Sequence, residues 1–214
     1  VDYDLVDLEV VKPAPAAATL QELAAGLPQA LVRPAPLRPG DEVPDFSMVD
    51  QDGEARRLSD LRGRVVVLTF IYTRCPIPEF CPAMDRKFSE LARSLSNSPA
   101  RAAGVRLVSL SFDPDHDTPE VLRKHAKIRG AEPPLWTFAA APHDELAKVA
   151  PRLGLTYGPM KDEIVHNLCT AVIGPDGRLA RLEVGTRGND WTTADLLKTV
   201  AELLPGPDAR PCTP

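Results

Sequence analysis

R-V-V-V-L-T-F-I-Y (64–72), followed by T-R-C-P-I-P-E-F-C-P-A-M (73–84), is the part of the chain that decides the fold. After its first arginine the stretch is an uninterrupted run of aliphatic, β-branched and aromatic side chains, which predicts a strand covered on both faces. A proline-rich loop with two cysteines follows at once. A helix is predicted over 83–96, because apolar side chains then recur at helical spacing. This order places the cysteines at the carboxyl end of a buried strand, where open α/β sheets usually carry their sites.

The rest of the chain supplies further strands and helices around this unit. The pattern predicts a hairpin turning at Asp52-Gly53, strands over 105–112, 136–138, 165–173 and 178–184, and helices over 119–128, 144–153 and 193–204. Alternating strands and helices that end in a hairpin and a helix favour a mixed central sheet with helices on both faces. With a cysteine loop after the first main strand, we expect an α/β fold of the thioredoxin-like class.

The first 42 residues differ in composition from the remainder. Residues 2–11 alternate polar and apolar side chains, as a half-buried strand does, and a short helical run covers 20–27. Proline and alanine are dense around them, which indicates a semi-rigid connector rather than a second core. We therefore expect an N-terminal arm and linker at 1–42, the thioredoxin-like domain at 43–205 and a tail at 206–214.

Charge and hydropathy narrow the classes of partner. The 214 residues carry a net charge of −5, and the basic residues are scattered among acids, so nucleic acid is not expected as a partner. The sequence contains no apolar run long enough to span a bilayer. Because it opens at Val1, we expect a processed or trimmed chain whose attachment to a membrane, if any, depends on a segment that is missing here.

Four cysteines, Cys75, Cys81, Cys169 and Cys212, are too few for a disulfide-built scaffold of this length. The close pair in the loop therefore indicates chemistry or a metal, with a small structural disulfide as the plain alternative. Pro82 places Cys81 near the start of a helix, whose dipole favours a thiolate, and Arg74 acts in the same direction. A thiolate is both the better nucleophile and the better metal ligand, so these features leave the two functions open.

The five residues between Cys75 and Cys81 include two prolines. A disulfide across this loop remains possible, because closing so short a loop costs little. The loop also leaves room for an ion between the sulfur atoms, and two soft thiolates suit Cu(I) or Zn. Two ligands rarely suffice for a metal. His166, at the start of a predicted strand, is the candidate for the third.

Taken together, several motifs make the chain resemble the Sco/SenC family of copper-binding thioredoxin-like proteins. They are F-S-M-V-D-Q-D-G (46–53), L-R-G-R-V-V-V-L-T-F-I-Y-T-R-C-P (61–76), C-P (81–82), S-F-D-P-D-H-D-T-P-E-V-L (111–122) and the histidine-led strand that ends in V-I-G-P-D-G-R (172–178). The resemblance implies that Cys75, Cys81 and His166 bind copper, as Cu(I) or Cu(II). It also implies a metallochaperone that serves the copper centre of a terminal oxidase, or another copper protein, as an exported, periplasmic monomer.

Three positions depart from the family pattern. Five residues separate the cysteines where three are usual, His116 stands where arginine is usual, and Asn167 follows the histidine where serine is common. The spacing puts the geometry of the copper site and the identity of the client in question.

The other candidate residues have simpler interpretations. His116 and Asp113 lie in an acidic turn after a strand and could approach the site, but a solvated turn is the simpler reading. His125 and His143 are expected to be ordinary helix residues, and Met84 and Met160 to be packing residues. Cys169 is expected to be a buried inert thiol on the strand face opposite His166, and Cys212 to be exposed in the tail.

Two other functions compete with the metallochaperone. A thiol-disulfide oxidoreductase would use Cys75 and Cys81 as a redox-active pair and would not need His166. A redox or copper sensor would dock a partner through the N-terminal arm. A peroxidase is a further activity of such folds, but no peroxide-activating surroundings are evident in the sequence.

Overall fold

The computed structural model describes residues 34–161, 163–186 and 191–204. The chain divides into two units, 1–34 and 35–214, and the helices and strands below belong to the second unit. The strand predicted at 2–11, the helical run at 20–27 and the tail with Cys212 lie outside the described residues. The boundaries of the arm, domain and tail therefore stay predictions.

A mixed seven-stranded sheet forms the centre of the second unit, in the order β2-β1-β5-β4-β3-β8-β9. Its strands are β1 (Ser47–Asp50), β2 (Ala55–Arg57), β3 (Val65–Ile71), β4 (Val105–Ser111), β5 (Trp136–Ala140), β8 (Leu168–Ile173) and β9 (Leu179–Gly185). The three central strands β3, β4 and β5 run parallel, whereas β1 and β8 pair with them in the antiparallel sense. A separate two-stranded sheet pairs β6 (Tyr157–Met160) with β7 (Glu163–His166).

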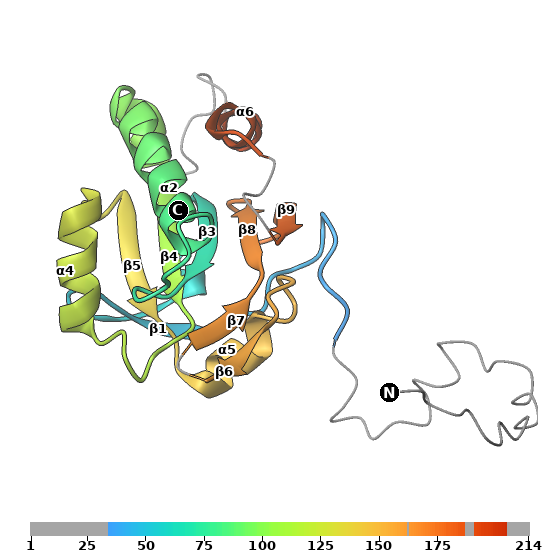
Figure 1. The fold of residues 1–214 in the computed structure, drawn as a ribbon. Helices are drawn as coiled ribbons and strands as arrows, with labels where there is room; N and C mark the ends of the chain where they lie inside the picture. Colours follow the sequence, from blue (N-terminus) through green and yellow to red (C-terminus); the bar gives the residue numbers. More distant parts are fainter. Residues whose placement is uncertain (1–33, 162, 187–190, 205–214) are drawn as a thin grey trace, which may run out of the picture. The chain divides into compact units, whose positions relative to one another are not determined.

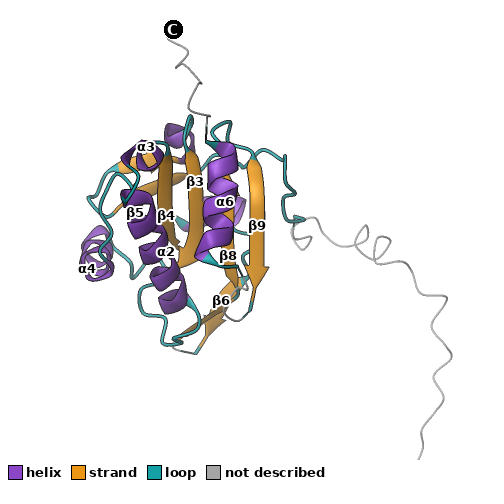
Figure 2. Cartoon of the chain, turned by 90° about the horizontal axis from the view of Figure 1, so that it is seen from above, coloured by secondary structure: helices purple, strands orange, loops and turns teal. Residues whose placement is uncertain are grey.

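Helices cover both faces of the central sheet. They are the 3-10 helix η2 (Leu58–Leu61), α2 (Cys81–Ser96), α3 (Pro99–Ala103), α4 (Pro119–Arg129), α5 (His143–Val149) and α6 (Thr193–Leu203). Figures 1 and 2 place α2 and α6 over one face, and Figure 1 places α5 on the other side, beside β6. The expected thioredoxin-like arrangement, a mixed sheet flanked by helices, is confirmed.

The central strand β3 has the burial that its sequence predicts. All seven of its residues are buried, because α2 packs on one side of the sheet and a second apolar layer lies on the other. The apolar stripe of α2 also lies in the core, including Met84, Phe88 and Leu91. These two elements fix the positions at which the cysteine loop begins and ends.

Two boundaries differ from the sequence prediction in ways that affect the site. Helix α2 begins at Cys81, two residues before the predicted start, so the second cysteine is part of the helix. The strand predicted over 165–173 is interrupted at Asn167 and becomes β7 and β8, which belong to different sheets. Among the described residues no helix has the length and apolar character needed to cross a bilayer.

Candidate metal centre

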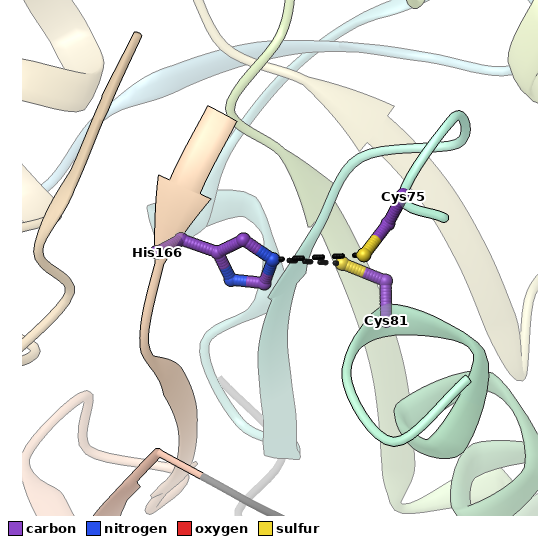
Figure 3. A group of neighbouring side chains, drawn as sticks. All are labelled: Cys75, Cys81 and His166. Carbon is purple, nitrogen blue, oxygen red and sulfur yellow. Dashed lines mark hydrogen bonds between the residues drawn. The ribbon is translucent and has the colours of Figure 1, made fainter. Parts of the chain in front are cut away.

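Cys75, Cys81 and His166 converge at the carboxyl end of β3 (Figure 3). Their Sγ and imidazole nitrogen atoms all lie within 4.8 Å of one another, and all three residues are buried. Nε2 of His166 is 3.7 Å from Sγ of Cys75 and 3.7 Å from Sγ of Cys81. Residues that are far apart in the sequence therefore form a three-donor cluster, as expected of a metal site.

The five residues between the cysteines fold into a turn that brings the two sulfur atoms together. The N–H of Phe80 donates to the carbonyl of Ile77 at 3.0 Å, which closes the turn. Arg86, one turn into α2, donates to the carbonyl of Pro78 at 3.1 Å and holds the outer side of the loop. The wider loop thus bulges outward and leaves both cysteines facing His166.

Cys81 is the first residue of α2, and its sulfur lies inside the fold. Pro82 occupies a first-turn position, where a missing N–H costs nothing. The N–H of Tyr72, at the end of β3, donates to Sγ of Cys81 at 3.4 Å. The end of β3 and the start of α2 thereby hold this sulfur atom from two sides.

His166 reaches the sulfur atoms from the last position of β7. Its Nδ1 lies 2.8 Å from the backbone carbonyl of Asn167. A carbonyl can only accept, so Nδ1 carries the proton in this contact and Nε2 of the neutral ring keeps its lone pair. The lone pair is directed at the two sulfur atoms, where it can bind a metal ion or take a proton from a thiol.

Aromatic rings enclose the imidazole of His166. The ring centroids of Tyr72, Phe80 and Phe112 lie 5.5, 5.2 and 5.1 Å from that of His166. Phe80 belongs to the loop between the cysteines, so this loop supplies part of the enclosure. Burial raises the pKa of Tyr72 to about 12, and the neighbouring Cys75 adds to the rise. The rings keep water from most of the imidazole and limit its rotation.

A buried carboxylate fixes the start of the cysteine loop. Asp117 is fully buried and accepts hydrogen bonds from the N–H of Thr73 at 3.0 Å and from the hydroxyls of Thr73 and Ser111. Asp113 forms an ion pair with Arg74 at 2.8 Å. The residues that follow β4 therefore hold the two residues just before Cys75. The sequence pattern pointed to Asp113 but not to Asp117, although both follow the end of a buried strand.

The two thiols differ in their acidity. A hydrogen bond from the Cys81 thiol is the main cause that lowers the pKa of Cys75 to about 4. Burial and the neighbouring Cys75 raise the pKa of Cys81. The expectation that the helix dipole favours a thiolate at Cys81 is wrong, because burial outweighs it. Arg74 does not act on the cysteines as expected, since its guanidinium is paired with Asp113.

This asymmetry predicts the pH dependence of alkylation at Cys75. A thiol of ordinary pKa, about 8.5, gains roughly tenfold in thiolate per pH unit below that value. Cys75, with a pKa of about 4, stays a thiolate from pH 6 to 8 and loses reactivity only as the pH falls through about 4. We expect a nearly constant rate of reaction with iodoacetamide from pH 6 to 8, measured on the Cys75 peptide by mass spectrometry. A tenfold rise per unit over this range would contradict the assignment.

The remaining histidines lie away from the three-donor cluster. His116 is exposed in the turn before α4. Nε2 of His125 lies 2.8 Å from Asp85, and Nε2 of His143 lies 3.0 Å from Asp115. The predictions that His125 and His143 are ordinary paired residues on helices are confirmed.

The remaining sulfur residues also lie outside the cluster. Cys169 is buried, and burial raises its pKa to about 12, so the prediction of a buried inert thiol is confirmed. His166 and Cys169 do not share one strand, however, because β7 ends before β8 begins, so strand alternation does not set their relative directions as predicted. Met84 is fully buried in the core, whereas Met160 is 57% exposed on β6.

Comparison with known proteins identifies relatives over most of the chain. The sequence model of the SCO1/SenC family matches residues 35–202. The SCO1 protein homolog of Bacillus subtilis (strain 168) is 28% identical over 144 residues, which cover 65% of this chain and 72% of that protein. The chain spans only 50% of the length of the mitochondrial SCO2 homologues of Bos taurus and Homo sapiens.

Solved structures with a similar fold include Sco proteins. BsSco, a member of the Sco family of cytochrome c oxidase assembly proteins in which a disulfide switch has been identified, is 26% identical with a TM-score of 0.64. The match covers 79% of this chain and 98% of that one. The structure of Bradyrhizobium japonicum ScoI with copper bound is 24% identical with a TM-score of 0.61, over 77% of this chain and 100% of that one.

Proposed function

The chain belongs to the SCO1/SenC family, and from this premise we propose that it is a copper metallochaperone that binds one copper ion. Sγ of Cys75, Sγ of Cys81 and Nε2 of His166 are the proposed ligands. Their convergence at equal sulfur-to-nitrogen distances of 3.7 Å is the observation that carries the proposal. The copper-bound structure of a relative with the same fold supports the choice of metal.

The distances within the cluster suit a metal ion at its centre. Thiolate and imidazole ligands usually lie about 2.3 and about 2.0–2.1 Å from a metal, which puts sulfur and nitrogen about 3.5–3.8 Å apart at angles of roughly 110–120°. Both observed separations, 3.7 Å, fall within that range. Two soft thiolates and one imidazole match the preference of copper, as Cu(I) or Cu(II).

The surroundings of the cluster suit a cargo that is bound and then passed on. Cys75 is already a thiolate at neutral pH, so metal binding has to displace a proton only from Cys81. Cys75 also lies on the loop, beside exposed Pro76 and Ile77, whereas Cys81 is fixed by α2. A recipient thiol or imidazole can approach on the side of Cys75 and replace the ligands in turn.

The recipient in this proposal is the copper centre of a terminal oxidase, or another copper protein, outside the cytoplasm. Membership of the family and the relationship to BsSco support this client. In the same proposal the protein acts as an exported monomer on the periplasmic side.

The proposal predicts one copper ion per reduced chain, lost when either cysteine of the cluster is replaced. We expect Cys75→Ala and Cys81→Ala to remove tight copper binding, measured by metal analysis after dialysis against a competing chelator. Cys169→Ala is the matched control, since Cys169 is buried but lies outside the cluster. Full copper loading of either cluster variant, or loss of copper from the control, would contradict the assigned ligands.

The unequal acidity of the two thiols favours a second candidate function, a thiol-disulfide oxidoreductase. The Cys75 thiolate would attack one sulfur of a client disulfide and release the other as a thiolate. Cys81, after losing its proton, would attack Cys75, which frees the reduced client and leaves a Cys75–Cys81 disulfide. This activity requires an external thiol reductant for the next turnover and does not require His166.

A further inference from the structure

Asn167 is the single residue between the two-stranded sheet and the central sheet. β7 ends at His166 and β8 begins at Leu168. The part of the chain that the structure describes pairs β7 only with β6, so no sheet hydrogen bond ties His166 to the central sheet, from which the cysteine loop departs. The position of the imidazole therefore depends on how this junction is held.

Both the backbone and the side chain of Asn167 hold the junction. Its N–H donates to the carbonyl of Thr156 at 3.1 Å, and its Oδ1 accepts from the N–H of Thr156 at 2.8 Å. Its Nδ2 donates to the carbonyl of Gly154 at 2.9 Å. The carboxamide thus behaves as an additional peptide unit that closes the open end of the β6–β7 hairpin.

The same residue contacts the imidazole directly. The backbone carbonyl of Asn167 accepts from Nδ1 of His166 at 2.8 Å. Three hydrogen bonds hold the backbone N–H and the side-chain carboxamide of Asn167. They thereby fix the direction of its backbone carbonyl. A continuous set of contacts therefore runs from Gly154 and Thr156 through Asn167 to the ring of His166.

We propose that Asn167 is a positioning residue that fixes the imidazole of His166 with Nδ1 protonated and Nε2 directed at the sulfur atoms of Cys75 and Cys81. Its importance for copper rests on the proposed function, whereas its control of the ring does not. Partners of this kind typically change metal affinity 10- to 100-fold when they are removed.

A shorter side chain cannot replace the carboxamide. Asn167 uses an acceptor and a donor, on different atoms, for Thr156 and Gly154. A serine hydroxyl is shorter by one heavy atom and offers both roles on a single oxygen. Serine is the residue that the family resemblance leads one to expect here. We infer that the carboxamide matters in this chain because the hairpin depends on it for closure.

The test measures the ring and the metal separately in Asn167→Ala. In the metal-free protein at pH 8, ¹⁵N–¹H correlation spectra of the imidazole report which nitrogen carries the proton. We expect Nδ1 of His166 to be protonated in the native protein, and this fraction to fall in the variant. Copper affinity, from competition with a chelator, is expected to fall at least tenfold. Asn97→Ala, at an exposed residue that ends α2, is the matched control.

Each outcome decides one of the two proposals. An Asn167→Ala protein with native ring protonation and native copper affinity overturns the positioning role. Native protein that binds no copper overturns the proposed function, and the imidazole spectra still decide the positioning role. If circular dichroism finds Asn167→Ala unfolded, Asn167→Ser receives the same two measurements, with the same expected directions and the same contradicting result.

Discussion

Replacement of His166 by alanine is expected to abolish tight copper binding while the chain stays folded. The variant loses the only nitrogen ligand of the cluster and leaves two thiols, which rarely suffice for a metal. Loss of an outer partner of a metal ligand typically costs about 10- to 100-fold in affinity, so loss of the ligand itself should cost more. The measurement is the copper stoichiometry and the copper affinity of the reduced protein.

The control for this experiment is His116→Ala, because His116 is exposed and lies outside the cluster. We expect native copper affinity for the control. The same pair of variants separates the two candidate functions. A thiol-disulfide oxidoreductase would keep its rate in His166→Ala, since the thiol reaction uses only Cys75 and Cys81. Retention of native copper affinity in His166→Ala would refute the three-ligand site.

The fold followed from the sequence wherever a strand or helix has a strong local signal. The run at 64–72 predicted β3 because a strand buried on both faces needs apolar side chains at every position. Thr118 and Pro119 predicted the start of α4, where the Thr118 hydroxyl accepts from the N–H of Val121. The break at Asn167 had no such signal. It depends on hydrogen bonds to Gly154 and Thr156, which lie more than ten residues away.

The sequence predicts which residues form the candidate site, but it does not predict the contacts that hold them in place. Cysteines at the end of a buried strand indicate a site, and the family resemblance added His166. The resemblance could not say whether five intervening residues preserve the cluster. That outcome depends on the turn at Ile77–Phe80 and on the hydrogen bond from Arg86 to Pro78, neither of which the sequence pattern predicts. Asp117 went unnoticed because an acidic turn usually indicates a solvated helix start.

Asp117→Ala is expected to cause a large loss of stability. Asp117 is 0% exposed and accepts the backbone N–H of Thr73 and the hydroxyls of Thr73 and Ser111. Alanine leaves the Thr73 N–H with no acceptor, and an orphaned buried donor costs about 1–3 kcal/mol. Two hydroxyls also lose a charged partner. We expect unfolding to become easier by about 2–4 kcal/mol, which lowers Tm by roughly 5–15 °C in a protein of this size.

The support that Asp117 gives to Thr73 extends to the metal centre, because Thr73 lies two residues before Cys75. Asp117→Ala should therefore bind copper more weakly, even at temperatures where it is folded. Asp117→Asn keeps an oxygen acceptor for the Thr73 N–H and should lose less stability than the alanine variant. The matched control is Asp115→Ala, since the side chain of Asp115 is 84% exposed and pairs with an exposed histidine. If Asp117→Ala and Asp115→Ala melt at the same temperature, then Asp117 does not hold the cysteine loop, and the order of this loop must come from β3 and α2 alone.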